Sequence, residues 1–465
     1  MESSQRIKEG AWRNQECNAI LERWDQVVSI RKQRPAVFAP DGSVLRTFAA
    51  IEEEAGHWRD SLDDRAGEAV CLQAGNHPSW PAILLAVWQS GRTVLPMDFE
   101  MRDARRERVE RLCGVGLRVE PQGTALRLVP VEHSAPASVR SDALKLTSGT
   151  TGEPRAIRFT AAQLLADCDN VCDTMGLRED DRNYGVISFA HSYGFSNLIT
   201  PLLCRGIPLV VASDVMPRAL VEGLASSGAT LFPGVPAIFR TLAEVAGAGS
   251  ALRLCISAGA LLTREGAWRF LENWGLKLHS FYGASECGGI CYDSSEAPDV
   301  PPGYVGPPLR NVSVTMENSG PSQIQVRGPA VGSGYHPEQA TENLRDGVFR
   351  PSDLLEWNGD GYVIAGRTSD LINVGGRKVN PGEVERVLRL SPRVRDVVVL
   401  GIAGKARGEE VAACVAGEAT EDELRRLCSR NLPAWQVPRR WFFLEEIPLS
   451  ARGKVSRAEL RARLE

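Results

Sequence analysis

Residues 144–158 read LKLTSGTTGEPRAIR, an apolar start that runs into a loop rich in small polar side chains. The hydroxyl groups, each able to donate a hydrogen bond to an anion, belong to Thr147, Ser148, Thr150 and Thr151. Gly149 and Gly152 let the backbone turn sharply, which brings its N–H groups close to the same anion. The Gly-Lys-Ser/Thr of the common nucleotide loop does not follow at the required spacing. The stretch indicates a polyphosphate-binding loop, with a plain turn between two strands as the alternative.

Four further stretches follow this loop along the chain. They are FAHSYG at 189–194, SFYGASECGG at 280–289, the segment from RPSDLLEW to NPGEVE at 350–385, and PLSARGKVSR at 448–457. Together with the loop, and in the same order, they resemble the motifs of the adenylate-forming (AMP-binding) superfamily. That family includes acyl-CoA synthetases, stand-alone adenylation domains and luciferases. Residues 55–99 also resemble its amino-terminal region, so the resemblance covers nearly the whole chain.

Length and composition narrow the class of protein. A chain of 465 residues exceeds the usual single core, so two or more domains are expected. A net charge of −4 gives no general attraction to nucleic acid or to anionic lipid. The polar amino terminus lacks a signal-peptide core, and the longest apolar stretches are too short for membrane insertion. Eleven scattered cysteines without a Cys-x-x-Cys motif indicate free buried thiols and a cytoplasmic protein.

The order of apolar runs predicts an α/β fold. From about residue 66 to 235, short apolar runs alternate with helical segments, which is typical of parallel sheets with crossover helices. Residues 303–366 instead show closely spaced short strands, which predict a small antiparallel or barrel-like region. Within it, NGDG at 358–361 is a strong hairpin signal.

The pattern changes again after Arg367. A helix is expected from Pro381, capped by Asn380 with Glu383 reaching back, and a second helix from the pair Thr420 and Glu423. Two apolar strands lie between these helices, so a small α+β domain is expected. We place the boundary near residue 368, which gives an AMP-binding domain over 1–368 and a lid domain over 369–465. In the resembled family this small domain is mobile.

The resemblance assigns the ATP-binding residues. Residues 147–152 would hold the β- and γ-phosphates, and Arg155 stands where the family usually has a lysine. Tyr282 would stack on the adenine and Ser285 would contact the α-phosphate. Glu286 would be a catalytic residue that holds Mg²⁺, an ion that takes one or two carboxylates together with phosphate oxygens.

Further assignments fall on the segment 350–385. Asp353 and Arg367 match the pair that binds the ribose hydroxyls, and an exposed ion pair on a hairpin is the alternative. The family's Thr-Gly-Asp is Pro351-Ser352-Asp353 here. Ser369 occupies the hinge position, where the family commonly has Asp or Lys, so the hinge is assigned by position alone.

Lys454 matches the lysine that bridges the substrate carboxylate and the α-phosphate during adenylation. In the family, the small domain then rotates, which removes this lysine and brings a glycine-rich segment to the thiol tunnel. Gly375 and Gly376 match the tunnel glycines, because only glycine lets a narrow pantetheine arm pass close to the backbone.

The acyl pocket is assigned to His191, Gly259 and Gly283. His191 lies where acyl-activating members carry a catalytic histidine, and a core or capping histidine is the alternative. FAHSYGFS contains no Asp to pair with a substrate amine, which favours a plain carboxylic acid. Glycine at 283, where enzymes for the smallest acids carry Trp, leaves room for an aryl or medium-chain acid rather than acetate.

These assignments predict an ATP-dependent carboxylic acid–CoA ligase that uses ATP, Mg²⁺ and CoA. A close alternative loads the acyl group onto the phosphopantetheine of an acyl carrier protein. From a different class, the chain could be an inactive acyl-nucleotide-binding module, for which Arg155, Ser369 and the altered 351–353 loop are the support. The small carboxylic acid is the expected partner, and nucleic acid is not.

Overall fold

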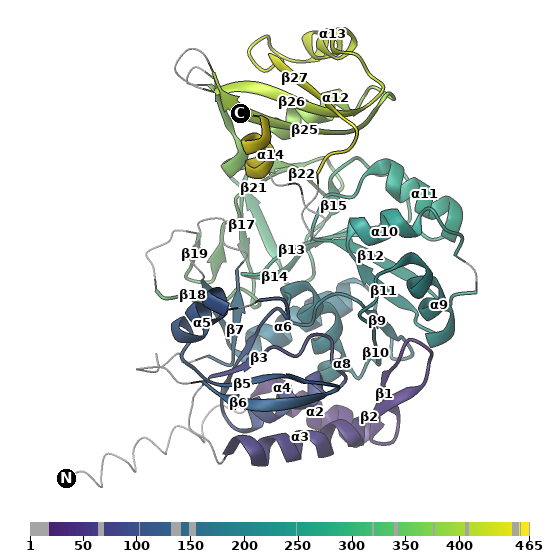
Figure 1. Cartoon of the computed structure of the whole chain (residues 1–465), viewed down its shortest axis with the longest axis vertical. Helices are drawn as coiled ribbons and strands as arrows, with labels where there is room; N and C mark the ends of the chain where they lie inside the picture. The colour runs from purple at the N-terminus through teal and green to yellow at the C-terminus, as the bar shows by residue number, and fades with distance from the viewer. Residues whose placement is uncertain are drawn as a thin grey trace, which may run out of the picture. The chain divides into compact units, whose positions relative to one another are not determined.

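Two compact units make up the chain (Figure 1). The computed structural model describes residues 18–464 except 64–68, 102, 132–140, 148–154, 248, 319, 339–342, 375–376, 405–408, 449–454 and 456. The large unit comprises residues 1–300, 305–314 and 325–350, and the small unit comprises 301–304, 315–324 and 351–465. The predicted domain boundary near residue 368 stays a prediction.

An eight-stranded sheet dominates the described part of the large unit. Six of its strands are parallel, and an antiparallel strand closes each edge. The strand order is β14 (Gly288–Tyr292), β13 (Leu278–Ala284), β12 (Leu254–Ala258), β11 (Leu231–Gly234), β9 (Asn183–Gly185), β10 (Leu209–Val211), β1 (Pro35–Phe38) and β2 (Val44–Thr47).

Helices connect the parallel strands, as such strands require. The chain passes from β9 to β10 through α7 (Ser192–Gly194), the π-helix η2 (Phe195–Ile199) and α8 (Thr200–Arg205). The later crossovers are α9 (Pro217–Ser227), α10 (Pro236–Leu242) and α11 (Arg264–Trp274). The predicted α/β class with parallel sheets is therefore confirmed.

The second sheet of the large unit contains β7 and β8, the two strands that flank the predicted polyphosphate-binding loop. Its order is β18 (Gly334–His336), β8 (Ala156–Phe159), β7 (Ala143–Leu146), β4 (Thr93–Pro96), β3 (Ala69–Leu72), β5 (Val115–Gln122) and β6 (Ala125–Pro130). The four strands from β7 to β5 are parallel. Its loop-bearing end is antiparallel, because β8 pairs with β7 on one side and with β18 on the other.

Apolar helices complete the core of this unit. The helices are α2 (Ala19–Arg31), α3 (Phe48–Asp63), α4 (Trp80–Gln89), α5 (Asp103–Leu112) and α6 (Ala161–Thr174). Every residue of α4 from Trp80 to Trp88 is buried, which explains a sequence that is apolar all round. Helix α6 begins with a capping box in which Thr160 and Gln163 satisfy each other's backbone N–H groups.

An antiparallel region follows β14, as predicted for residues 303–366. It contains β15 (Tyr304–Gly306), β16 (Ser313–Met316), β17 (Ser322–Arg327), β19 (Leu344–Arg345), β20 (Val348–Phe349), β21 (Asp353–Trp357) and β22 (Tyr362–Arg367). The NGDG turn joins β21 to β22, and Trp357 pairs with Tyr362 across it. The side-chain oxygen of Asn358 accepts hydrogen bonds from the backbone N–H groups of Asp360 and Gly361.

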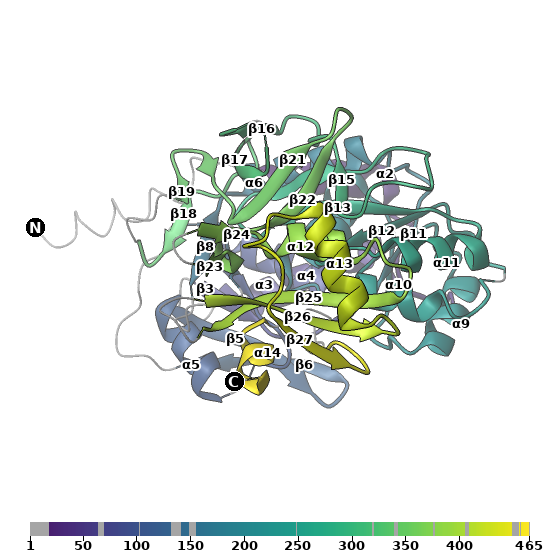
Figure 2. The same cartoon turned by 90° about the horizontal axis from the view of Figure 1, so that it is seen from above.

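The rest of the small unit is an α+β domain. A ladder of β23 (Ile372–Val374) and β24 (Arg377–Val379) precedes a sheet of β25 (Val394–Ala403), β26 (Glu409–Gly417) and β27 (Arg440–Leu444), seen side by side in Figure 2. Alternate residues of β25 and β26 point to opposite faces. One face packs on α12 (Pro381–Leu388) and α13 (Glu421–Asn431), and the other packs on α14 (Arg457–Leu464).

The two predicted helix starts of this domain differ in detail from the expectation. Asn380 does cap α12, because its side-chain oxygen accepts from the Gly382 N–H at 3.0 Å. Glu383 instead accepts a hydrogen bond from Gln436. Thr420 makes no side-chain cap, and Glu423 pairs with Arg393. The expected capping roles of Thr420, Glu383 and Glu423 were wrong, because longer-range donors bind both glutamates.

Two expectations from composition bear on the described residues. Ten cysteines are free and buried, which fits the free thiols that the sequence indicates. None of the helices in the described part of the chain has the length and hydropathy needed to span a bilayer.

Candidate active site

Two neighbouring strands of the eight-stranded sheet, β12 and β13, lead into predicted site residues at their carboxyl ends. Strands β11, β12 and β13 are parallel, so their carboxyl ends lie together. In open α/β sheets, ligands bind beyond this edge. Gly259 follows β12 with φ +88°, a conformation that favours glycine, and it is exposed. The motif SFYGASECGG forms the end of β13 and the turn into β14.

The base of the predicted phosphate loop is held by strand pairing. Leu146 pairs with Ala156, and the Thr147 N–H donates to the Arg155 carbonyl at 3.0 Å. Both ends of the loop are therefore fixed, whereas Ser148, Gly149, Thr150, Thr151 and Gly152 lie outside the described residues. Arg155 Nε is buried without a hydrogen-bond partner among the residues that the structure describes. A buried guanidinium nitrogen in this state suits an anionic ligand.

Glu286 is contacted by β18 and by the segment just before it. Its carbonyl accepts from the Gly332 N–H at 2.8 Å, and its Oε1 accepts from the Tyr335 hydroxyl at 3.0 Å. Burial and the charge of Glu286 raise the pKa of Tyr335, and the charge of Arg155 opposes that rise. The hydroxyl consequently stays protonated and donates to the carboxylate. Arg155, Glu286 and Tyr335 therefore form one electrostatic group, although Arg155 and Tyr335 lie far apart in the sequence.

The HSYG and SFYGASE motifs meet through two serines. Ser192 Oγ donates to Ser285 Oγ at 3.0 Å, across 93 residues of sequence. His191 is exposed, and its Nδ1 accepts from the Tyr193 N–H at 3.2 Å. This capping contact is the alternative considered for His191, and its catalytic role stays a prediction. What the structure shows is that His191 lies one residue from the serine that contacts Ser285.

The backbone at Gly283 lies very close to the backbone of β14. A Cβ atom built on Gly283 would lie 2.6 Å from the Gly288 carbonyl oxygen, so a side chain there would displace β14. Glycine at 283 is required by this close backbone approach, whatever the acid. Glycine at 283 therefore does not by itself indicate a large acid, and the place of Gly283 in the acyl pocket stays a prediction. Tyr282, its buried neighbour, pairs with Cys291, and the adenine-stacking role also stays a prediction.

In the small unit, Asp353 and Arg367 face each other across the β21–β22 hairpin. Arg367 Nε donates to Asp353 Oδ1 at 2.7 Å, and the side chains are 56% and 14% exposed respectively. The ion pair considered as the alternative is thus present. Because the carboxylate is already oriented by the guanidinium, the pair remains suited to accept ribose hydroxyls, and that role stays a prediction.

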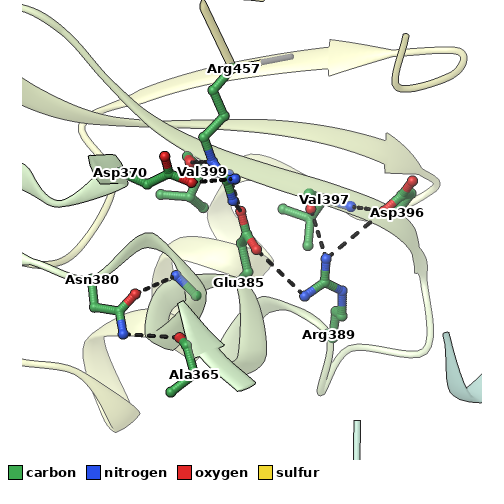
Figure 3. A network of polar contacts seen from close by, with 10 residues as sticks. Ala365, Asp370, Asn380, Glu385, Arg389, Asp396, Val397, Val399 and Arg457 are labelled. Atoms are coloured by element: carbon green, nitrogen blue, oxygen red, sulfur yellow. Dashed lines mark hydrogen bonds and ion pairs between the residues drawn. The ribbon is translucent and has the colours of Figure 1, made fainter. Parts of the chain in front are cut away.

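The predicted hinge lies beside a network of charged groups (Figure 3). Ser369 belongs to the 3₁₀ turn η3 (Thr368–Asp370). Arg457 Nη1 donates to Asp370 at 2.8 Å and Nη2 donates to Glu385 at 2.6 Å, while its Nε donates to the Val399 carbonyl. Arg457 closes the motif that contains Lys454, so this network joins that motif to the hinge segment. Lys454, Gly375 and Gly376 themselves lie outside the described residues.

Sequence reasoning missed three of the residues that shape these contacts. Tyr335 lies 49 positions from Glu286 and outside every motif, so no local pattern marks it. Ser192 lies within HSYG but has no distinguishing context there. Arg457 is the last residue of PLSARGKVSR, and its position in that motif was the available signal.

The chain is similar to known protein families, curated proteins and solved structures. Residues 143–336 match the AMP-binding enzyme family, and residues 383–454 match the AMP-binding enzyme C-terminal domain. A feruloyl-CoA synthase of Amycolatopsis sp is 28% identical over 91% of this chain and 94% of its own. A 2-succinylbenzoate–CoA ligase of Bacillus mycoides is 30% identical over 69% of each chain. The amide bond synthetase McbA of Marinactinospora thermotolerans shares the fold, with TM-score 0.82, 23% identity and coverage of 96% and 99%.

These matches and the site they cover establish the class of protein. The chain belongs to the AMP-binding, adenylate-forming enzyme family. Within that family it is an acid–thiol ligase of the AMP-forming, acyl-CoA synthetase type.

Proposed function

We propose that this enzyme joins a plain, non-amino carboxylic acid larger than acetate to CoA through an acyl-adenylate. One observation carries the proposal: Ser285 and Glu286 meet the HSYG segment and Tyr335 at the carboxyl edge of the parallel sheet. The absence of Asp from FAHSYGFS supports an acid without an amine. Two relatives are named for feruloyl and 2-succinylbenzoate substrates, which supports an aryl acid over a medium-chain one.

In the first step, a carboxylate oxygen attacks the α-phosphorus of ATP. The bond from that phosphorus to the oxygen bridging to the β-phosphorus breaks, and pyrophosphate leaves. Both reactants are anions, so positioning and charge neutralisation supply most of the catalysis. Arg155 and the loop that begins at Thr147 would bind the leaving phosphates, and Ser285 would contact the α-phosphate.

The residues around Glu286 fit a magnesium ion. Mg²⁺ is bound by one or two carboxylates together with phosphate oxygens, and the half-buried Glu286 carboxylate is oriented by Tyr335. When bound, the ion would neutralise charge on the phosphates. Tyr335 would keep the carboxylate oriented before and during the reaction, because its hydroxyl stays protonated.

In the second step, the thiol sulfur attacks the acyl carbon and AMP leaves. Lys454 is assigned to the first step only, and Gly375 and Gly376 to the path of the thiol in the second. We place the reaction in the cytoplasm, where the ten free buried thiols would stay reduced.

The test is acid-dependent release of pyrophosphate across a panel of aryl and two- to eight-carbon acids. Each acid is assayed with CoA and, separately, with a phosphopantetheinyl carrier protein as acceptor. We expect release with aryl acids and thioester formation on CoA. If thioester forms only on the carrier protein, the acceptor is a carrier protein and not CoA. If the protein binds nucleotide but releases pyrophosphate with none of the acids, it is the inactive binding module.

A further inference from the structure

A buried carboxylate contacts two segments of the candidate site. Asp167 belongs to α6 and is 4% exposed, on the helix face that also carries Leu164, Cys168 and Val171. Three of these four positions are apolar, as expected for a core-facing stripe. Burying a carboxylate is costly unless hydrogen bonds satisfy it. The hydrogen-bond partners of Asp167 therefore indicate what this carboxylate does in the fold.

The two oxygens of Asp167 bind two different segments of the site. Oδ2 accepts from Ser196 Oγ, in the π-helix that directly follows the HSYG motif. Oδ1 accepts from the Gly289 N–H at 2.9 Å, in β14 and three residues after Glu286. One side chain thus joins the segment of His191 to the segment of Glu286, across 29 and 122 residues of sequence.

The backbone at Gly288, two residues after Glu286, leaves space for the Asp167 carboxylate. Gly288 has φ +70°, and a Cβ atom built on it would overlap the Asp167 carboxylate. Glycine is therefore needed at 288 both for the backbone conformation and for the close approach of Asp167. A π-helical turn, such as the one that holds Ser196, is rare and often marks a functional site.

A buried lysine supplies the opposite charge. Lys145 is 4% exposed, and its amine lies 4.8 Å from the ring centre of Phe159 and 4.9 Å from that of Phe195. Burial lowers the pKa of Lys145, and the nearby Asp167 charge opposes that shift. No carboxylate of the described residues forms an ion pair with Lys145, so it acts on Asp167 through space. Aromatic faces stabilise a desolvated cation in such a position.

We propose that Asp167 is a positioning residue for adenylation, which fixes the HSYG segment and the Glu286 segment relative to each other. The inference rests on the proposed function only for the roles of those two segments. A carboxylate suits this place because each of its oxygens accepts, and here one accepts a hydroxyl and the other a backbone N–H. Together with the Ser192–Ser285 contact, it gives the two segments a second point of attachment.

Two variants remove this attachment to different extents. Asp167→Asn keeps the shape and removes the charge, while Ser196→Ala removes one donor with a minimal change in volume. Asp169→Asn is the matched control, because Asp169 lies on the same helix but pairs with Arg205 and Arg23. All three are made in the full chain.

The measurements are kcat for pyrophosphate release, KM for ATP, and the Mg²⁺ concentration that gives half-maximal rate. We expect Asp167→Asn and Ser196→Ala to lower kcat about tenfold and to raise the Mg²⁺ requirement, because small misplacements of reacting groups cost one to two orders of magnitude in rate. Asp169→Asn should change neither quantity. Denaturant midpoints measured in parallel separate a loss of stability from a loss of positioning.

Unchanged kcat and Mg²⁺ dependence in both site variants would overturn the inference, as would equal losses in Asp169→Asn. Direct calorimetric binding of ATP with Mg²⁺ tests it without any acid. If the unaltered protein binds ATP but activates no acid, the proposed function fails. The inference then stands only if Asp167→Asn and Ser196→Ala bind ATP with Mg²⁺ more weakly than Asp169→Asn does.

Discussion

Two charged clusters, one in each unit, join segments that carry predicted site residues, and they do so by different means. In the large unit, Asp167 accepts from a hydroxyl and a backbone N–H, and its counter-charge Lys145 is not in contact with it. In the small unit, Arg457 contacts two carboxylates directly, those of Asp370 and Glu385. The first cluster is buried, whereas the Arg457 side chain is 31% exposed.

The two clusters should differ in which substitutions they tolerate. The hydrogen bonds that Asp167 accepts depend on geometry as well as on charge, so the Asp167 cluster should also be sensitive to volume and to the glycine beside it. Ion pairs depend on charge, so the Arg457 cluster should be sensitive to charge removal. In the small unit, a substitution of Lys454 should slow adenylation more than thioester formation, because this lysine is assigned to adenylation alone.

The largest effect is expected for Lys454→Ala. Loss of one charge-stabilising donor typically costs about 10²–10³-fold, so pyrophosphate release should fall by that amount. Thioester formation from supplied acyl-AMP should be largely spared. Single-turnover assays of the two half-reactions measure both quantities. Gly376→Leu should have the reverse effect on the two half-reactions. It should block the path of the thiol, which would stop thioester formation and spare pyrophosphate release. Equal loss in both half-reactions for Lys454→Ala would contradict the separation of roles.

Gly288→Ala tests the packing against Asp167. The left-handed backbone costs an alanine about 1–2 kcal/mol, and overlap with the carboxylate adds about 1–3 kcal/mol. Gly275→Ala is the control, because Gly275 has φ +67° and no atom within 4 Å of the added Cβ. Denaturant unfolding should show the larger loss of free energy for Gly288→Ala. Equal losses would mean that the carboxylate moves aside at no cost.

Arg457→Met tests the charged cluster of the small unit. It removes the ion pairs to Asp370 and to the buried Glu385, so the free energy of unfolding should fall by about 2 kcal/mol, a value discounted for partial exposure. Arg425→Met is the control, because its ion pair with Glu421 is exposed on both sides and should contribute at most about 0.5 kcal/mol. Denaturant midpoints of the full chain decide between them, and indistinguishable midpoints would remove the stabilising role of the cluster.

The smallest effect is expected for Tyr335→Phe. It removes the hydrogen bond to Glu286 but keeps the ring, so about 1 kcal/mol should be lost, or roughly fivefold in kcat/KM for ATP with Mg²⁺. Raising the Mg²⁺ concentration should restore part of the rate, because the ligand itself remains. Tyr362→Phe, on the other unit, should leave the Mg²⁺ dependence unchanged. A Tyr335→Phe enzyme with normal Mg²⁺ dependence would show that Glu286 does not need this donor.

The sequence by itself determined the family, the α/β class, the antiparallel hairpin at NGDG and the helix cap at Asn380. Each of these is encoded locally: by a motif, by the period of apolar residues, or by turn residues whose backbone preferences do not depend on distant parts of the chain. The roles predicted for Thr147, Ser285 and Glu286 were likewise assigned from motifs in the local sequence.

Only the tertiary structure decided how those residues are held. Tyr335 contacts Glu286, and Asp167 contacts Gly289 across 122 residues, because the fold brings β18 and helix α6 next to the β13–β14 segment. The contacts between Glu383 and Gln436 and between Glu423 and Arg393 replaced the local caps for the same reason. The hydrogen-bond partner of a side chain depends on which donors the fold places nearby, and the neighbouring sequence does not determine those donors.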